Sequence, residues 1–128
     1  MLSHKATPES QGRYEADVAL AATFDDLLDH ARKADDTLRA AEVRRADVIE
    51  IHRLAKDLDT ALTNAMHAAY ARERAAIGPR GYEDRIFFRK AKAKPEVRPL
   101  IADAERLLTL RENHRMNRIP EVPRQPSV

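Results

Sequence analysis

Residues 48–81 decide the fold, and they read VIEIHRLAKDLDTALTNAMHAAYARERAAIGPRG. Ile51, Leu58 and Ala65 recur at seven-residue intervals, and apolar residues three and four positions away widen the stripe. This three-in-seven pattern is typical of an amphipathic helix in a bundle or a broad coiled coil. The Gly-Pro pair after residue 77 cannot continue a helix, so the pattern predicts that this long helix ends there.

The apolar stripe of this helix is wide and rich in alanine, so a second helix can approach it closely. One chain of this composition buries little apolar surface, and we therefore expect self-association, most simply as a twofold dimer. The residues predicted to form this self-association seam are Ile51, Leu54, Ala55, Leu58, Ala61, Leu62, Ala65 and Ala69.

The helix-permissive region extends upstream of this stretch. From residue 13 to residue 77 the sequence holds no Gly and no Pro and is rich in Ala, Leu, Arg, Glu and Asp, which favours helix throughout. The apolar stripe of the first part is out of phase with that of the second, because Arg44 and Arg45 fall where core residues are expected. The change of phase indicates either a turn somewhere in residues 33–47 or a stutter that shifts the seam.

A turn near residues 33–36 is the interpretation we favour. Asp35 and Asp36 are suitable for capping a helix that begins directly after them. We therefore predict one helix over residues 14–32 and a second over residues 37–77. A single continuous helix with a stutter in its seam is the alternative.

Two further pieces follow the Gly-Pro stop. Residues 78–95 form a basic connecting segment, within which residues 82–93 are compatible with a short helix. Leucine and alanine at helical spacing then predict a last helix over residues 96–117, with Pro99 in its first turn.

Polar segments flank the predicted helical domain, which spans residues 13–117. Residues 1–12 are polar and contain Pro and Gly, so we expect a disordered N-terminal segment. Residues 118–128 hold three prolines, which favours an extended tail with polyproline character.

The composition of the 128-residue chain points to an all-α fold. Hydrophobic types make up 43% of the residues and charged types 34%, with only three Gly and no Trp. Few β-branched residues and a thin, alanine-rich core argue against barrels, sandwiches and doubly wound sheets. We expect an elongated helical hairpin or three-helix arrangement built on one long amphipathic, coiled-coil-like helix.

Cysteine usage and hydropathy suggest where the chain works. The sequence has no Cys, which excludes disulfides and thiolate chemistry and is compatible with a reducing compartment. Its start lacks the apolar core of a secretory signal, and no apolar run approaches the ~18 residues that span a membrane. We expect a cytoplasmic protein without a membrane contact.

The sequence motifs give little support for catalysis or for metal binding. Asp26 and His30 lie four positions apart on one helix face, but one such pair supplies only two ligands. Phosphate-binding glycine loops and nucleophile elbows are absent from the sequence. We expect no metal site, no cofactor and no catalytic residue.

The basic segment is the most distinctive part of the sequence. Residues 80–99 carry seven Lys or Arg and three Asp or Glu, whereas residues 1–79 carry eleven and fourteen. Its aromatic and apolar residues, Ile86, Phe87 and Phe88, are predicted to plug the end of the helical core. The side chains predicted to contact phosphates or an acidic partner are Arg80, Arg85, Arg89, Lys90, Lys92, Lys94 and Arg98.

These observations favour a non-catalytic helical interaction or adaptor protein that self-associates and docks a protein partner through charged faces. The alternative is a small accessory or regulatory protein that binds nucleic acid, with residues 80–98 on phosphates. The two functions can be distinguished by salt, because the binding of a protein to several phosphates weakens steeply as the salt concentration rises.

Overall fold

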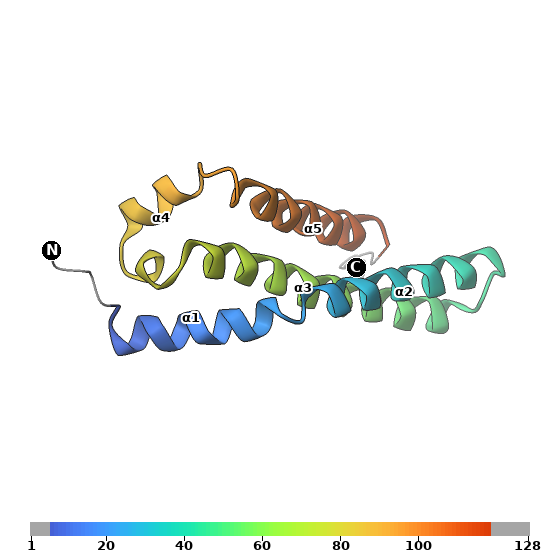
Figure 1. Cartoon of the computed structure of the whole chain (residues 1–128). Helices are drawn as coiled ribbons and strands as arrows, with labels where there is room; N and C mark the ends of the chain where they lie inside the picture. Colours follow the sequence, from blue (N-terminus) through green and yellow to red (C-terminus); the bar gives the residue numbers. More distant parts are fainter. Residues whose placement is uncertain (1–5, 119–128) are drawn as a thin grey trace, which may run out of the picture.

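The computed structural model describes residues 6–118, and every regular element in that range is helical (Figure 1). The elements are α1 (Pro8–Ala21), α2 (Phe24–Val43), α3 (Val48–Ile77), the short 3-10 helix η1 (Pro79–Tyr82), α4 (Arg85–Ala91) and α5 (Arg98–Asn117). The all-α prediction is confirmed. Most of the predicted Pro-rich tail lies outside the described residues.

The central element is α3, because α1, α2 and α5 all pack against it. Arg72, near the end of α3, lies over the ring of Phe24 at the start of α2. Ala55, near the start of α3, contacts His114 near the end of α5. Hence α3 runs antiparallel to both α2 and α5, as Figure 1 also shows. α2 and α5 pack chiefly against α3 rather than against each other.

Alanine residues allow this close packing. Ala65, Ala68 and Ala69 of α3 have no exposed surface, and they share one core cluster with Leu38 of α2 and Leu107 of α5. Seven of the eight predicted seam residues are buried within the single chain, and the eighth is half-buried. The chain's own helices therefore cover most of the seam, and self-association through it stays a prediction.

A second, smaller core closes the end of the molecule that carries α4. Phe87 and Phe88 pack there against Ile77 and Val97. The predicted plug is thus correct for the two phenylalanines and wrong for Ile86, which is 66% exposed. The reason is helical geometry: on α4 the side chain of Ile86 points away from the face that the two rings share.

The N-terminal prediction is wrong for residues 8–12, which form the first turns of α1. Thr7 Oγ1 accepts a hydrogen bond from the Ser10 amide at 3.1 Å, and Pro8 occupies the first turn, where its missing N–H costs nothing. The buried Ser10 hydroxyl donates to Glu83 at 2.9 Å. This contact joins the start of α1 to the segment before α4.

The predicted turn at residues 33–36 is also wrong, because α2 continues through it. The chain turns instead at residues 44–47, and a further break at residues 22–23 separates α1 from α2. Asp35 and Asp36 are therefore ordinary helical residues and not caps. The predicted helix over residues 14–32 is in fact parts of two helices.

The turn at residues 44–47 ends one helix and begins the next without glycine. Arg45 adopts a positive φ of 56°, and the amides of Arg45 and Ala46 donate to the carbonyls of Glu42 and Ala41, at 3.2 and 3.0 Å. This is the hydrogen-bond pattern of a Schellman motif. Asp47 then caps α3 by accepting from the third amide of the new helix.

Arg45→Gly is expected to stabilise the protein by about 1 kcal/mol, because a side chain at positive φ carries a steric cost that glycine lacks. For a chain of this size the melting temperature should rise by about 3–5 °C. Thermal unfolding followed by circular dichroism measures this. Arg44→Gly is the control, since Arg44 has an ordinary φ of −81°. Equal shifts for the two variants would contradict the explanation.

Candidate functional site

An open groove of about 650 Å³ runs between α2 and α5, with α3 as its floor. Its size is within the usual range for ligand and partner sites. Apolar side chains from all three helices line it: Phe24, Leu28, Ala31, Leu58, Leu62, Leu107 and Leu110. Leu110 is 48% exposed, so apolar surface remains open to an occupant.

Four arginines rim this groove: Arg32, Arg39, Arg106 and Arg118. Arg39 and Arg118 both bind Asp35, at 3.0 and 2.8 Å. Burial raises the pKa of Asp35, but the hydrogen bonds from the two arginines outweigh that effect and lower it. Arg32 and Arg106 form no ion pair with any other residue in the range 6–118. The rim therefore carries two arginines, Arg32 and Arg106, whose charge no ion pair within residues 6–118 balances.

Two arginine contacts close the ends of the groove. At one end Arg72 lies 4.2 Å above the Phe24 ring and 3.4 Å from Asp103, so α3 links α2 to α5. At the other end Arg118, which follows α5, reaches Asp35 of α2. Between these two bridges, α2 and α5 are held apart at a fixed spacing.

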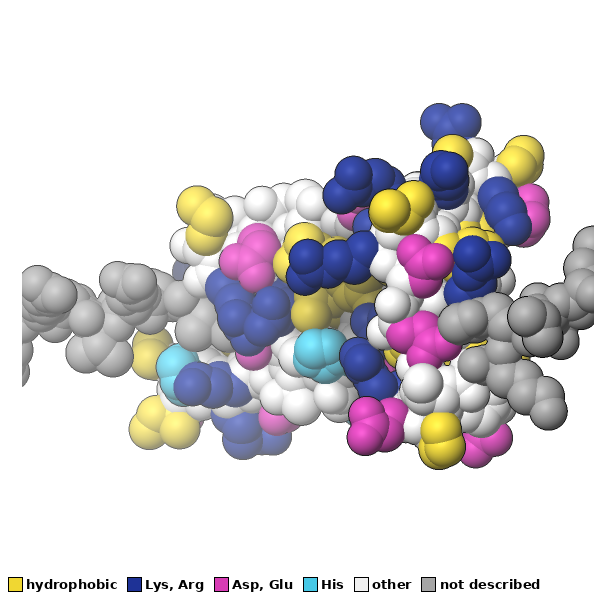
Figure 2. All heavy atoms as spheres, turned by 90° about the vertical axis from the view of Figure 1, so that its left-hand side faces the viewer, with side chains coloured by type: hydrophobic (Ala, Val, Ile, Leu, Met, Phe, Trp, Pro, Cys, Tyr) yellow, Lys and Arg dark blue, Asp and Glu magenta, His cyan; other side chains and the backbone are white. Residues whose placement is uncertain are grey.

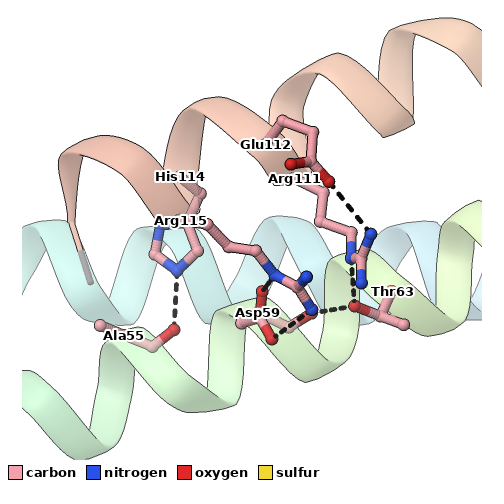
Figure 3. A network of polar contacts seen from close by, with 7 residues as sticks. All are labelled: Ala55, Asp59, Thr63, Arg111, Glu112, His114 and Arg115. Carbon is pink, nitrogen blue, oxygen red and sulfur yellow. Dashed lines mark hydrogen bonds and ion pairs between the residues drawn. The ribbon is translucent and has the colours of Figure 1, made fainter. Parts of the chain in front are cut away.

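Polar contacts from one face of α5 lock this helix onto α3 (Figure 3). Arg115 binds Asp59 through two bonds of 2.6 and 3.3 Å, and Arg111 donates to the Thr63 hydroxyl at 2.8 Å. The hydrogen bond from Arg115 lowers the pKa of the Asp59 carboxyl, although partial burial opposes this. These bonds therefore fix α5, which forms one wall of the groove, on α3, which forms its floor.

His114, one of the residues that line the groove, carries a buried polar atom that has no partner among residues 6–118. Its Nε2 lies 2.7 Å from the carbonyl oxygen of Ala55. Because a carbonyl oxygen only accepts, Nε2 must carry a hydrogen and donate it in this bond. The side chain is 6% exposed, and Nδ1 has no partner among residues 6–118. Such buried orphan atoms are rare and point to a missing partner.

At the opposite end of α3, a polar cluster joins α1 to the segment before α4. Asp17 of α1 accepts two hydrogen bonds from Arg74, at 2.8 and 3.1 Å, and a short one from the Tyr82 hydroxyl. Burial raises the pKa of Asp17, but the bonds from Arg74 and Tyr82 outweigh it and leave the pKa below its ordinary value. This cluster holds the end of the molecule together.

The predicted basic segment divides into separate groups around α4. Figure 2 views this end of the molecule, where Lys and Arg side chains gather with Asp and Glu among them. Three of the predicted residues, Arg85, Arg89 and Lys92, line a common pocket. Arg80 and Lys94 instead flank the Phe87 ring, at 4.5 and 5.8 Å from its centre.

The remaining two, Lys90 and Arg98, are exposed and belong to neither group. Only three of the seven predicted residues thus line a common pocket. Their contact with phosphates or an acidic partner stays a prediction.

Asp26 and His30 both lie exposed on α2. Residues 6–118 contain no group of three or more His, Asp or Glu side chains placed to hold a metal ion. In the same range, no helix combines the length and apolar character that crossing a bilayer requires.

Sequence reasoning missed the groove and its most informative residues, Arg32, Arg106, Leu110 and His114. The polar residues at the end of the predicted last helix were not singled out, yet Arg111, His114 and Arg115 form hydrogen bonds with α3. A signal was present: Arg111, His114, Arg115 and Arg118 follow helical spacing and so share one side of α5. Comparison of the chain with protein-family models, curated proteins and solved structures found no significant match.

Proposed function

We propose that this chain is a non-catalytic helical interaction protein whose groove between α2 and α5 binds an acidic amphipathic helix of a partner protein. The observation that carries the proposal is the open apolar groove with unneutralised arginines on its rim. Helix-in-groove binding is a common mode of recognition that needs an apolar trough and a matched polar border.

The dimensions of the groove suit a helix of three to four turns. The two arginine bridges are eleven residues apart on α2, from Phe24 to Asp35, and fifteen apart on α5, from Asp103 to Arg118. At 1.5 Å per residue these spans are about 16 and 22 Å. A helix of that length, lying opposite α3, would complete a four-helix bundle with α2, α3 and α5.

The charge of the rim selects the partner's chemistry. Arg32 extends from α2 and Arg106 from α5, so carboxylates on both flanks of a bound helix would each meet an arginine. Arginine binds carboxylates through paired hydrogen bonds, which adds orientation as well as affinity.

A synthetic peptide tests this function. Its design is an amphipathic helix of about 14 residues, the length of the groove, with leucines on one face and glutamates on the flanks. Fluorescence polarisation measures its binding to the full chain. A peptide of the same composition, scrambled so that the leucines do not share a face, is the control. We expect binding of the first peptide and at least about tenfold weaker binding of the second.

Leu110→Glu and Leu108→Glu are the matched variants on the protein side. Leu110 lines the groove, whereas Leu108 is exposed on the same helix outside it, at 37%. Leu110→Glu should weaken binding of the amphipathic peptide at least about tenfold, and Leu108→Glu should weaken it less than about threefold. Equal effects, or equal binding of both peptides, would refute a groove site. If Leu110→Glu instead dissociates a dimer of the chain, the occupant is a second copy and the proposal fails.

A further inference from the structure

A second pocket lies at the end of the molecule that carries α4, remote from the groove. It has a volume of about 450 Å³ and draws its cationic lining from three places: Arg13 of α1, Arg74 of α3, and Arg85, Arg89 and Lys92 on and just after α4. None of its lining residues is acidic. Such a concentration of positive charge in a concave site focuses the field and attracts anions.

Two of the five cations are already neutralised. Arg74 is held by Asp17 at 2.8 Å, and Lys92 lies 3.6 Å from the buried Glu73. Arg85 and Arg89 form no ion pair with another residue of the described range. Both are exposed, and they lie four positions apart on one face of α4, where like charges repel. An anion between them would remove that repulsion.

The third cation, Arg13 of α1, forms no ion pair within the described residues, although the carboxylate of Asp17, one turn along the helix, lies near enough to interact with its charge. Arg13 lies 5.4 Å from the centre of the Tyr82 ring, and Lys92 lies 5.0 Å from the centre of the Phe88 ring. The two aromatic residues of the pocket are therefore both engaged by cations. A nucleic-acid base would have to displace these cations in order to stack, so the pocket offers charge rather than a stacking platform.

We infer that this pocket binds the phosphoryl group of a small molecule, with Arg13, Arg85 and Arg89 as the cations that hold it. Three cations without an ion pair in the described range match an oligophosphate such as a diphosphate, which carries several negative charges. Arginine suits this role because its planar guanidinium donates paired hydrogen bonds to phosphate oxygens. This site is independent of the helix-binding groove, and either can exist without the other.

Inorganic pyrophosphate is the probe for this inference. Isothermal titration with the full chain, at about 50 mM salt, should show saturable binding to one site. The double variant Arg85→Gln/Arg89→Gln should lose at least about tenfold in affinity, because charge-assisted hydrogen bonds are strong. The matched control is Lys90→Gln/Arg98→Gln, which removes the same charge from exposed positions in the same segment but outside the pocket. We expect it to change affinity less than about threefold.

The other outcomes each overturn the inference. Absence of pyrophosphate binding would refute the site, and equal weakening by both double variants would show a diffuse basic surface rather than a pocket. Binding of single-stranded or duplex DNA that pyrophosphate does not compete away would assign the segment to nucleic acid. Both double variants replace exposed side chains, so we expect them to fold like the wild type. Circular dichroism of each variant checks this.

Discussion

Replacing Leu58 by Asp is expected to unfold the whole chain at 25 °C, at every protein concentration. Leu58 is 3% exposed and lies in the core cluster that α2, α3 and α5 share. Removing the buried leucine costs about 2–5 kcal/mol. Burying an unpaired carboxylate adds several more. Domains of this size are stable by only about 5–15 kcal/mol in total.

Far-UV circular dichroism and sedimentation measure the outcome together. We expect the helical signal to be lost and no folded species of smaller mass to appear, because Leu58 is buried within the single chain. Thr60→Asp is the control, since Thr60 is exposed two positions away on the same helix. A variant that stays helical while its mass falls would show instead that Leu58 faces a second copy, as the sequence alone had suggested.

Asp17→Asn is expected to destabilise the protein by about 2–3 kcal/mol, the second largest effect. The change removes the charge that accepts hydrogen bonds from Arg74 and Tyr82, and bonds to charged groups contribute about 1.5–3 kcal/mol. Arg74 is partly exposed, so water compensates some of its loss. Urea unfolding measures the difference. Asp36→Asn, on the exposed face of α2, is the control and should change little.

The difference in unfolding free energy between the wild type and Asp17→Asn should also depend on pH. Because the pKa of Asp17 is lowered in the folded chain, its contribution is fully present above the unfolded value of about 3.9. It is lost as the pH falls through the lowered folded value. The gap in unfolding free energy between the wild type and Asp17→Asn should therefore be constant from pH 5 to 7 and close below pH 4. A gap that persists at pH 2 would contradict the role of the charge.

Several elements were predictable from local sequence. The end of α3 at Ile77 was predicted, because Gly78 adopts a φ of 98° that only glycine takes easily. The last helix was predicted to within two residues at its start, and the short helix within residues 82–93 corresponds to α4. In each case the deciding interactions lie within a few residues of chain.

The turn between α2 and α3 was misplaced because its usual marker is missing. Arginine stands at the left-handed position where glycine is expected, so composition gave no sign of it. The spacing of Asp47 and Glu50, a capping box, was nevertheless visible and would have placed the start of α3. The more conspicuous pair Asp35-Asp36 was given the weight instead.

The groove could not be predicted, because it depends on which side of α3 receives α5. That choice is made by contacts between distant residues, such as the bond between Arg118 and Asp35, which are 83 positions apart. No local pattern encodes such a pairing. The same holds for the pocket beside α4, where Arg13 comes from the first helix.

The separation of these contacts also sets an order of assembly. A four-residue turn joins α2 to α3, so this hairpin closes with little loss of chain entropy, whereas α5 must return over a much longer loop. The groove walls therefore meet only after the hairpin exists. A partner helix of the kind proposed above would therefore have no complete groove to bind until α5 has docked on the hairpin of α2 and α3.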